Sequence, residues 1–373
     1  MFKKYRLRDY DFKLVLMVLA LSVIGVMAIG SAESSLQNRQ LAGVAAGIFL
    51  MVVCSLFNYN FVLKFYWLMY GFNMVLLLMV TLPGLGHDSH GAQRWLDLGG
   101  FRFQPSEIAK IILILFFAQF IMKHKEKLNS VGIIGSCVVL MAAPLALVVK
   151  QPDLSTSIVL AAVFCFIMFA GGVSLKLVFG VMAVAIPAAA LIISLALQPD
   201  SELLTDYQRG RIFAFQAPDK YPDQARQQLN SVTAIASGML DGKGYKNNEI
   251  TSVKNGNFIS QTETDFIFSV IGEEFGFKGS ITVILLILGV SLECLSIARR
   301  AKDLAGTIIC AGVGGLVAFQ GFINIGVATF IMPNTGLTLP FVSYGLTSLL
   351  SLYMGIGFVL NVRLQEKNKI ESR

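Results

Sequence analysis

Charged residues are scarce in this chain. Only 14% of its 373 residues are charged and 55% are hydrophobic, whereas a soluble domain carries about 25% charged residues. This composition excludes an ordinary soluble fold and indicates that lipid surrounds most of the chain. The net charge of +7 does not indicate nucleic-acid binding, because the basic residues lie at the ends of apolar runs and form no single patch.

Cysteine and histidine are also rare. The five cysteines are Cys54, Cys137, Cys165, Cys294 and Cys310. All lie inside apolar runs without metal-ligand spacing, so we expect free, packed thiols and no disulfide framework. Of the three histidines, His87 and His90 lie beside Asp88, but no helix fixes their spacing, and we do not expect a metal site there.

Apolar runs long enough to cross a bilayer recur along the chain. A span needs about 20 apolar residues, and in lipid it must be helical, because its backbone groups find no water. The runs cover residues 12–30, 41–57, 61–82, 106–122, 132–149, 154–171, 175–197, 279–297, 305–329 and 342–362. We therefore predict an all-α integral membrane protein with about ten transmembrane helices. The first run lacks a small-residue cleavage site, so we expect it to be retained as a span.

The distribution of lysine and arginine predicts the orientation, because cytoplasmic segments carry most of these residues. With the N-terminus inside, the cytoplasmic segments contain Lys3, Lys4, Arg6, Arg8, Lys13, Lys64, Lys123, Lys125, Lys127, Lys176, Arg299, Arg300, Lys302, Arg363, Lys367, Lys369 and Arg373. The short outer loops keep Arg39, Arg94, Arg102 and Lys150. An even number of spans then makes both termini cytoplasmic.

Two outer segments are prominent in this topology. One is residues 83–105, and the other is residues 198–278, which is far longer than a connection between helices requires. Long loops on a rigid scaffold often carry function. Because the chain shows no internal repeat, we treat residues 1–373 as one domain, with a large extracellular loop between spans seven and eight.

The first outer segment leads into a charged helix start. Its sequence GAQRWLDLGGFRFQPSEIAK, residues 91–110, contains Arg94 and Trp95, which suit either a site or ordinary interfacial anchoring. Glu107 and Lys110 follow, three residues apart and so on one helix face. Charges at this depth mark either a functional site or a paired structural bridge.

Further polar segments lie on the same side of the membrane. Asp153 lies in KQPDLSTS, residues 150–157, which is either part of a site or a short polar turn. Arg209 and Arg211 begin the long loop and suit either a phosphate ligand or headgroup anchors. Residues 225–240 have apolar residues at helical spacing, which predicts an amphipathic helix on the membrane surface.

The string TETDFIFSVIGEEFGFKGS, residues 262–280, contains a candidate catalytic acid. If residues 265–276 are helical, one face carries Asp265, Ser269, Gly272, Glu273 and Gly276. Asp265 suits either catalysis or a helix cap, because the helix dipole favours an acid at this position.

The string NIGVATFIMPNTGLTLPFVSYGLTS, residues 324–348, contains two prolines and three glycines. Broken backbone at membrane depth must line a cavity or be buried in protein. Ser343 of this string is therefore counted among the candidate substrate-binding residues.

Together these strings resemble the SEDS family (shape, elongation, division and sporulation), which includes RodA, FtsW and SpoVE. The resemblance runs from about residue 12 to residue 362 and rests on GAQRWLDLGGFRFQPSEIAK, QPDLSTS, DYQRGRI, TDFIFSVIGEEFG and NIG…PNTGLTLPFVSYG, in family order. It implies a peptidoglycan glycosyltransferase of the bacterial cytoplasmic membrane that polymerises lipid II, an undecaprenyl-diphosphate-linked disaccharide peptide. It also implies a class B penicillin-binding protein transpeptidase as partner. Gln93 and Asp97 resemble the RodA branch, which implies a role in cell elongation and shape, and the FtsW-type division branch or the sporulation branch is the alternative.

The resemblance also implies roles for single residues. The catalytic acid of the family falls on Asp265. Its acid and base at the start of the fourth helix fall on Glu107 and Lys110, and the acid of its QPD string falls on Asp153.

One departure from the family pattern lies directly before the catalytic acid. Ser260 and Gln261 replace the usual Pro-Glu, and Glu263 replaces a frequent histidine. Asp265 itself is unchanged, whereas the resemblance does not extend to any role of the family's glutamate, because Gln261 stands at that position.

The implied chemistry defines what the other residues must do. The 4-hydroxyl of an acceptor sugar attacks the anomeric carbon of the donor, and a carboxylate acting as general base accelerates such a step by ~10²–10⁴-fold. Cations stabilise the departing diphosphate. The candidate substrate-binding residues are Arg94, Trp95, Glu107, Lys110, Asp153, Arg209, Arg211 and Ser343. One carboxylate with cations fits single displacement with inversion; the sequence requires no cofactor and leaves a divalent cation open.

A flippase for the same lipid is the alternative from another class of protein. A transporter is expected to show inverted repeats and charges near the bilayer midplane. Here no repeat is visible, and the charges cluster at the outer face. The sequence therefore favours the enzyme over the transporter and over a purely structural scaffold.

Overall fold

A computed structural model of the chain describes residues 9–82, 86–89, 92–97, 102–151, 153–174, 206–246 and 261–366, with a few single positions between them. The N-terminal part contains α1 (Phe12–Ala32), α2 (Ser34–Leu56), α3 (Tyr59–Val62), η2 (Leu63–Phe65), α4 (Tyr66–Thr81), α5 (Pro105–Lys123), η3 (Lys125–Lys127), α6 (Val131–Lys150) and α7 (Leu154–Ala170). The C-terminal part contains α9 (Asp206–Gln216), α10 (Pro222–Ser237), α11 (Ile267–Arg299), α12 (Leu304–Ala328) and α13 (Leu346–Glu366).

The predicted membrane spans are present as helices wherever the structure describes them. Eight helical segments are long and apolar enough to cross a bilayer, and α7 is a shorter apolar helix of 17 residues. They coincide with nine of the predicted runs, which confirms a multi-pass membrane protein. The remaining run, residues 175–197, lies outside the described residues except at isolated positions, so the total of ten stays a prediction.

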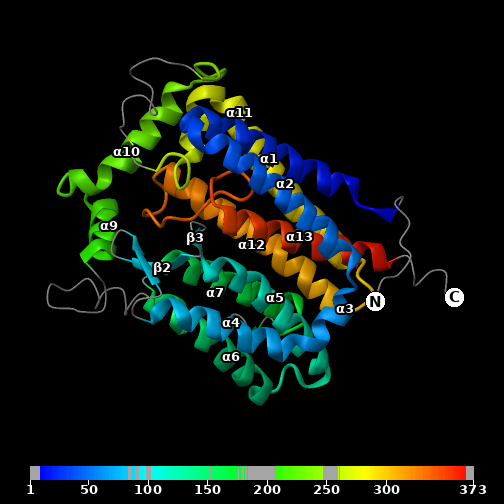
Figure 1. Cartoon of the computed structure of the whole chain (residues 1–373). Coiled ribbons are helices and arrows are strands. Elements are labelled where there is room, and N and C mark those ends of the chain that lie inside the picture. The colour runs from blue at the N-terminus through cyan, green and yellow to red at the C-terminus, as the bar shows by residue number, and fades with distance from the viewer. Residues whose placement is uncertain are drawn as a thin grey trace.

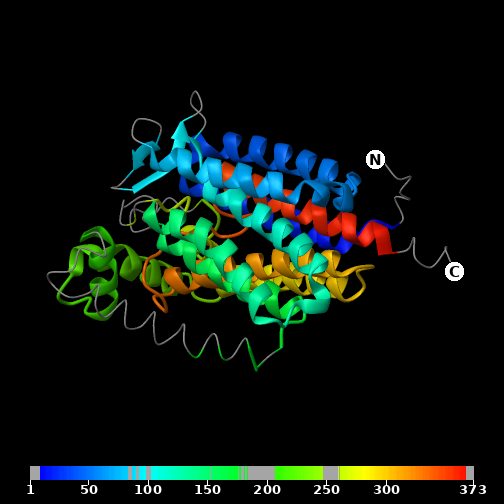
Figure 2. The same ribbon diagram turned by 90° about the horizontal axis from the view of Figure 1, so that it is seen from below.

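The helices run side by side along one direction (Figures 1 and 2). The start of α1 and the end of α13 lie at one end of the bundle, where Arg363 Nε is 3.7 Å from Asp11 Oδ2. We call this the cytoplasmic end, after the orientation that the lysine and arginine distribution predicts. Helices α9 and α10 and the strands lie at the opposite end, which we call the outer end. This arrangement agrees with an even number of crossings.

The centre of the bundle consists of α5, α12 and α13. Between 78% and 83% of their spans is buried, against 22–39% for the other long helices. The outer helices accordingly expose large apolar side chains, such as Phe49 of α2 and Leu68 of α4, which are 72% and 71% exposed. Such a surface is stable in lipid and not in water, so the burial pattern supports membrane insertion independently of composition.

The outer segment 83–105 contains a small sheet that was expected only as a loop. Strands β1 (Gly86–Ser89), β2 (Ala92–Asp97) and β3 (Arg102–Phe103) pair antiparallel in the order β1-β2-β3. The fold is mostly helical, as predicted, and this sheet is an addition to it. Strands of two to six residues between glycines are too short for an alternating pattern to identify.

The predicted helix over residues 265–276 is shifted and interrupted. Helix α11 begins at Ile267, and Asp265 lies in the turn before it. At Gly276 the backbone leaves the helical conformation (φ 63°, ψ −157°). The turn after α10 packs here so closely that a methyl group on Gly276 would lie 2.4 Å from Gly242 N. The expected common face of Asp265 and Gly276 is therefore wrong, because the helix includes neither as a regular member.

Helix α10 agrees with the amphipathic helix predicted over residues 225–240. Its buried face consists of small and polar residues, among which Gln228 and Ser231 donate hydrogen bonds to carbonyl groups at the end of α12 and just after it. Its apolar residues Leu229 and Val232 are exposed. The apolar face thus points away from the protein, as an interfacial helix requires.

Candidate functional site

The candidate site lies at the outer end, where the turn before α11 meets residues 329–345 between α12 and α13. Three successive carbonyl groups of this turn each accept a hydrogen bond. Glu263 O accepts from Tyr344 N (2.8 Å), Thr264 O from Ser343 Oγ (2.6 Å), and Asp265 O from Asn324 Nδ2 (2.9 Å). The backbone of the catalytic-acid candidate is therefore held by α12 and by the segment that follows it.

The Asp265 carboxyl lies beside a glycine and two arginines. Gly336 has φ +77°, and a methyl group added to it would lie 3.3 Å from Asp265 Oδ2 and 3.6 Å from Arg211 Nη1. Burial raises the pKa of Asp265 to about 6; Arg211 and Arg94 oppose this rise, and Glu263 adds to it. A carboxyl with a pKa just below neutral is ionised at pH 7 and basic enough to accept a proton.

Arg94 is placed by β2 against the start of α7. Its Nη1 lies 4.0 Å from Asp153 Oδ1, and its Nε donates to Gln151 O (3.4 Å). Asp153 is the N-cap of α7, where it accepts from Thr156 N and Oγ1, and it also accepts from Gln104 Nε2 (3.2 Å). The acid of the QPD string is thus both a cap and the partner of an arginine near Asp265.

Glu107 and Lys110 form the predicted pair on one face of α5. Lys110 Nζ lies 2.9 and 2.8 Å from the two carboxylate oxygens of Glu107, and both side chains are buried. Lys110 also donates to Gln320 Oε1 (3.0 Å), and Gln320 Nε2 donates to the Thr338 carbonyl and hydroxyl oxygens (3.0 Å each). The ion pair is therefore connected through α12 to the segment that holds Asp265.

The two arginines of the long loop do not act as neighbours. Both lie on α9, but two residues in a helix differ in direction by about 200°. Arg211 approaches Asp265 and donates to Asn334 O (3.4 Å), whereas Arg209 lies on a different face of α9 and is partly buried. Of these two arginines, the structure brings Arg211 to the carboxyl.

Two other predicted residues have different surroundings. Trp95 follows Arg94 on β2, and successive strand residues point to opposite faces, so it is not brought together with Arg94. The Ser343 hydroxyl donates to Thr264 O and accepts from Leu339 N (2.7 Å). Its observed contacts are with the backbone, and a contact with substrate stays a prediction.

Three residues of the network that joins Asp265 and Lys110 to the segment between α12 and α13 were not singled out from the sequence. Gln320 and Asn324 lie four residues apart in an otherwise apolar span, and buried amides in lipid are costly enough to have indicated a function. Gly336 gave no such signal, because one glycine among several in a broken segment is not distinctive.

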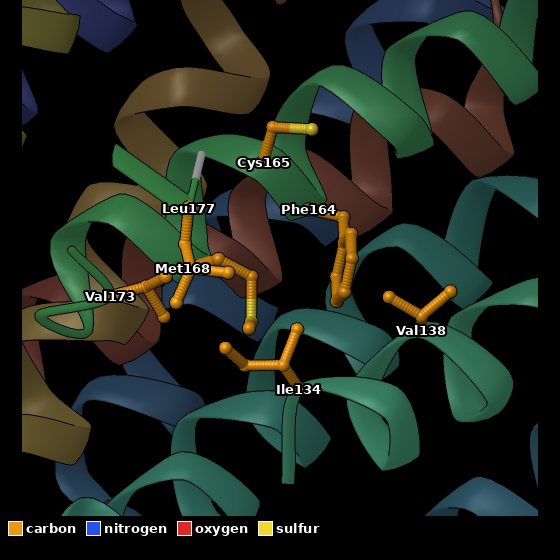
Figure 3. A pocket seen from close by; sticks show the side chains of 7 residues that line it. All are labelled: Ile134, Val138, Phe164, Cys165, Met168, Val173 and Leu177. Atoms are coloured by element: carbon orange, nitrogen blue, oxygen red, sulfur yellow. The ribbon is translucent and has the colours of Figure 1, made fainter. Parts of the chain in front are cut away.

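No metal-binding group competes with this site in the described part of the chain. No three His, Cys, Asp or Glu side chains gather there in a metal-binding group, and the five cysteines are free thiols. A cavity of about 40 Å³ lies elsewhere in the bundle, and Figure 3 shows the side chains that line it. It is lined by Ile134, Val138, Phe164, Cys165, Met168, Val173 and Leu177. These residues belong to the cytoplasmic half of α6 and α7 and the segment that follows, so the cavity is not part of the site.

The fold and the site define a multi-pass membrane protein with a buried carboxyl and several cations at one end of its helix bundle. The chain belongs to the FtsW/RodA/SpoVE family of cell cycle proteins, whose family model matches residues 10–368. This is the SEDS family that the sequence strings resemble.

Curated relatives and solved structures match almost the whole chain. The peptidoglycan glycosyltransferase MrdB of Escherichia coli K12 is 35% identical, with 96% of this chain and 94% of the relative covered. The probable peptidoglycan glycosyltransferase FtsW of Trichlorobacter lovleyi is 33% identical with the same coverage. A protein from a peptidoglycan synthase complex that coordinates polymerization and crosslinking matches with a TM-score of 0.79 and 29% identity, covering 96% of this chain and 98% of that one. The rod shape determining protein RodA of Thermus thermophilus matches with a TM-score of 0.71 and 26% identity, over 96% and 97%.

Proposed function

We propose that this chain is a peptidoglycan glycosyltransferase of the bacterial cytoplasmic membrane. It polymerises lipid II into glycan strands at the outer face of that membrane. The observation that carries this proposal is the Asp265 carboxyl beside Arg211, with a pKa of about 6. The names of the two relatives support the enzyme class.

In the proposed reaction Asp265 is the general base. The 4-hydroxyl of the acceptor sugar attacks the anomeric carbon of the donor while the carboxylate accepts the hydroxyl proton. The bond from that carbon to the diphosphate oxygen breaks, and the undecaprenyl diphosphate departs with its electron pair. The described site holds one carboxylate suited to this role, which fits a single displacement with inversion.

Arg211 and Arg94 are the cations best placed for the diphosphate. Both act electrostatically on Asp265, and the planar fork of arginine suits two phosphate oxygens. Lys110 is fully buried and engaged by Glu107 and Gln320. We therefore assign Lys110 to the support of the site, through its charge and its contact with Gln320.

We infer the biological role from the sequence of the first outer loop. Gln93 and Asp97 favour the RodA branch and thus cell elongation, although MrdB and FtsW relatives match with similar identity. A class B penicillin-binding protein is the proposed partner, and the match to a member of a peptidoglycan synthase complex supports this pairing.

The deciding experiment uses the purified chain in liposomes with lipid II and no ion gradient. Glycan strands should form with the wild type and not with Asp265→Asn, both with and without the co-expressed transpeptidase. Translocation of lipid II across the bilayer without any strand formation would identify a flippase and refute the proposal.

A further inference from the structure

Asn324 of α12 makes two hydrogen bonds to the backbone on either side of the catalytic carboxyl. It is 1% exposed, and its Nδ2 donates to Asp265 O (2.9 Å) and to Leu337 O (2.6 Å). These acceptors belong to different segments, the turn before α11 and the segment between α12 and α13. One side chain therefore fixes these two backbone segments relative to each other.

The second segment is the one that faces the carboxyl. Leu337 directly follows Gly336, where an added methyl group would contact both Asp265 Oδ2 and Arg211 Nη1. A displacement of Leu337 relative to Asp265 thus changes the space between the carboxyl and the guanidinium. Asn324 controls that displacement, because it bridges the two carbonyl groups.

The bridge requires an amide. Both partners of Nδ2 are carbonyl acceptors, so leucine, of similar size, supplies no donor, and an aspartate would place negative charge against two oxygens. Glutamine keeps the amide but moves it by one methylene group. These substitutions separate the hydrogen bonds from the volume of the side chain.

We propose that Asn324 is a positioning residue, which sets the placement of the Asp265 carboxyl relative to Arg211 during glycosyl transfer. This inference rests on the proposed function. A misplacement of about 1 Å at reacting groups lowers a rate by about 10²-fold, so the expected effect is on turnover more than on substrate binding.

Asn361 of α13 provides a matched control at the cytoplasmic end. It is 0% exposed, and its Nδ2 donates to Ser55 O (2.6 Å) while its Oδ1 accepts from Tyr59 N (2.9 Å). It is the same residue type with a comparable bridging role, but it lies at the other end of the bundle. Asn361→Leu should lower stability and leave turnover unchanged.

The test compares the wild type, Asn324→Leu, Asn324→Gln and Asn361→Leu in liposomes with lipid II. It measures kcat, KM for lipid II, the acid limb of the pH profile and the Tm. The charged groups that act on Asp265 are Arg211 from α9, Arg94 from β2 and Glu263 from its own turn. If the carboxyl moves away from the arginines, they lower its pKa less, and the acid limb should move to higher pH.

We expect Asn324→Leu to lower kcat by about 10- to 100-fold, with KM within about twofold and the acid limb at higher pH. Asn324→Gln should fold with a Tm near that of the wild type and still show the shifted limb, so the test does not depend on the leucine variant folding. An unchanged acid limb in the folded variants, or an equal loss of kcat in Asn361→Leu, would overturn the inference. An inactive wild type would instead refute the proposed function, and the inference would fall with it.

Discussion

The two ends of the bundle differ in how completely their buried polar groups are hydrogen-bonded. At the cytoplasmic end, Asn361 satisfies the backbone of Ser55 and Tyr59, and Asp303 accepts from the Tyr59 hydroxyl (2.8 Å) and caps α12 through Gly306 N (2.8 Å). At the outer end, several buried atoms have no hydrogen-bond partner within the described residues. They are Gln40 Oε1, Gln151 Oε1, Asn324 Oδ1, Asn334 Oδ1 and Thr335 Oγ1.

This difference separates a structural network from a binding site. Buried polar groups in folded proteins are nearly always hydrogen-bonded, and each exception requires an explanation. In the described ranges these unpaired side-chain atoms lie toward the outer end, beside the charges of the site, and Asn73 in the middle of α4 differs from them. Among the described residues the cytoplasmic network joins helix ends with paired side chains, whereas the outer network leaves buried acceptors unpaired close to the site.

The largest contrast between the two ends should come from their aspartates. Asp265→Asn should lower polymerisation by about 10²–10⁴-fold, because the amide cannot accept the proton, with little change in Tm. Asp303→Ala should instead cost about 0.5–2 kcal/mol of stability through the lost cap and leave kcat unchanged. The measurements are strand formation from lipid II and thermal unfolding in detergent. Near-normal synthesis by Asp265→Asn would remove it as the base.

The buried ion pair of α5 tests whether restoring two opposite charges at the outer end also restores activity. Lys110→Met should destabilise the protein by about 3–5 kcal/mol, because it leaves Glu107 buried without its cation. The double variant with the two charges exchanged should recover most of the Tm but not the activity, since the cation then lies one turn away and no longer bonds Gln320. Full activity in the exchanged variant would reduce the pair to a structural bridge.

Within the outer end, the two arginines of α9 are expected to differ in their effect on substrate binding. Arg211→Ala should raise the half-saturating lipid II concentration by about tenfold, corresponding to about 1.4 kcal/mol, and Arg211→Lys should recover part of this. Arg209→Ala is the matched control and should have a smaller effect. Initial rates are compared in neutral and in anionic bilayers. Equal effects of both alanine variants, seen in anionic bilayers only, would make the two residues headgroup anchors.

Much of this fold could be predicted because the bilayer constrains it strongly. Long apolar runs must be helices in lipid, so the spans followed from composition. The spacing of Glu107 and Lys110 also sufficed to predict a pair on one face of a helix, and the structure confirms the contact.

The parts that could not be predicted depend on tertiary contacts. The turn before α11 is held by three hydrogen bonds from residues 324–344, and no local pattern specifies them. The β-sheet before α5 is too short to be recognised in sequence. Asn324 and Gln320 carry a signal as amides in an apolar span, but their partners become known only when α12 is placed beside the site.

The smallest predicted effect concerns pH, and it separates chemistry from folding at a single residue. The pKa of Asp265 is raised from 3.8 to about 6, and the base must be ionised to act, so lowering the pH from 8 to 6 should about halve the rate. The effect on stability has the opposite sign, because the folded state favours the protonated carboxyl. The contribution of Asp265 to stability is fully present below pH 3.8 and is lost as the pH rises through about 6. Acidification should therefore lower the rate without Asp265 lowering the Tm, and Asp265→Asn should remove this contribution to the pH dependence of the Tm. A rate that stays flat from pH 8 to pH 5, or one that falls only in parallel with the Tm, would contradict the role of Asp265 as base.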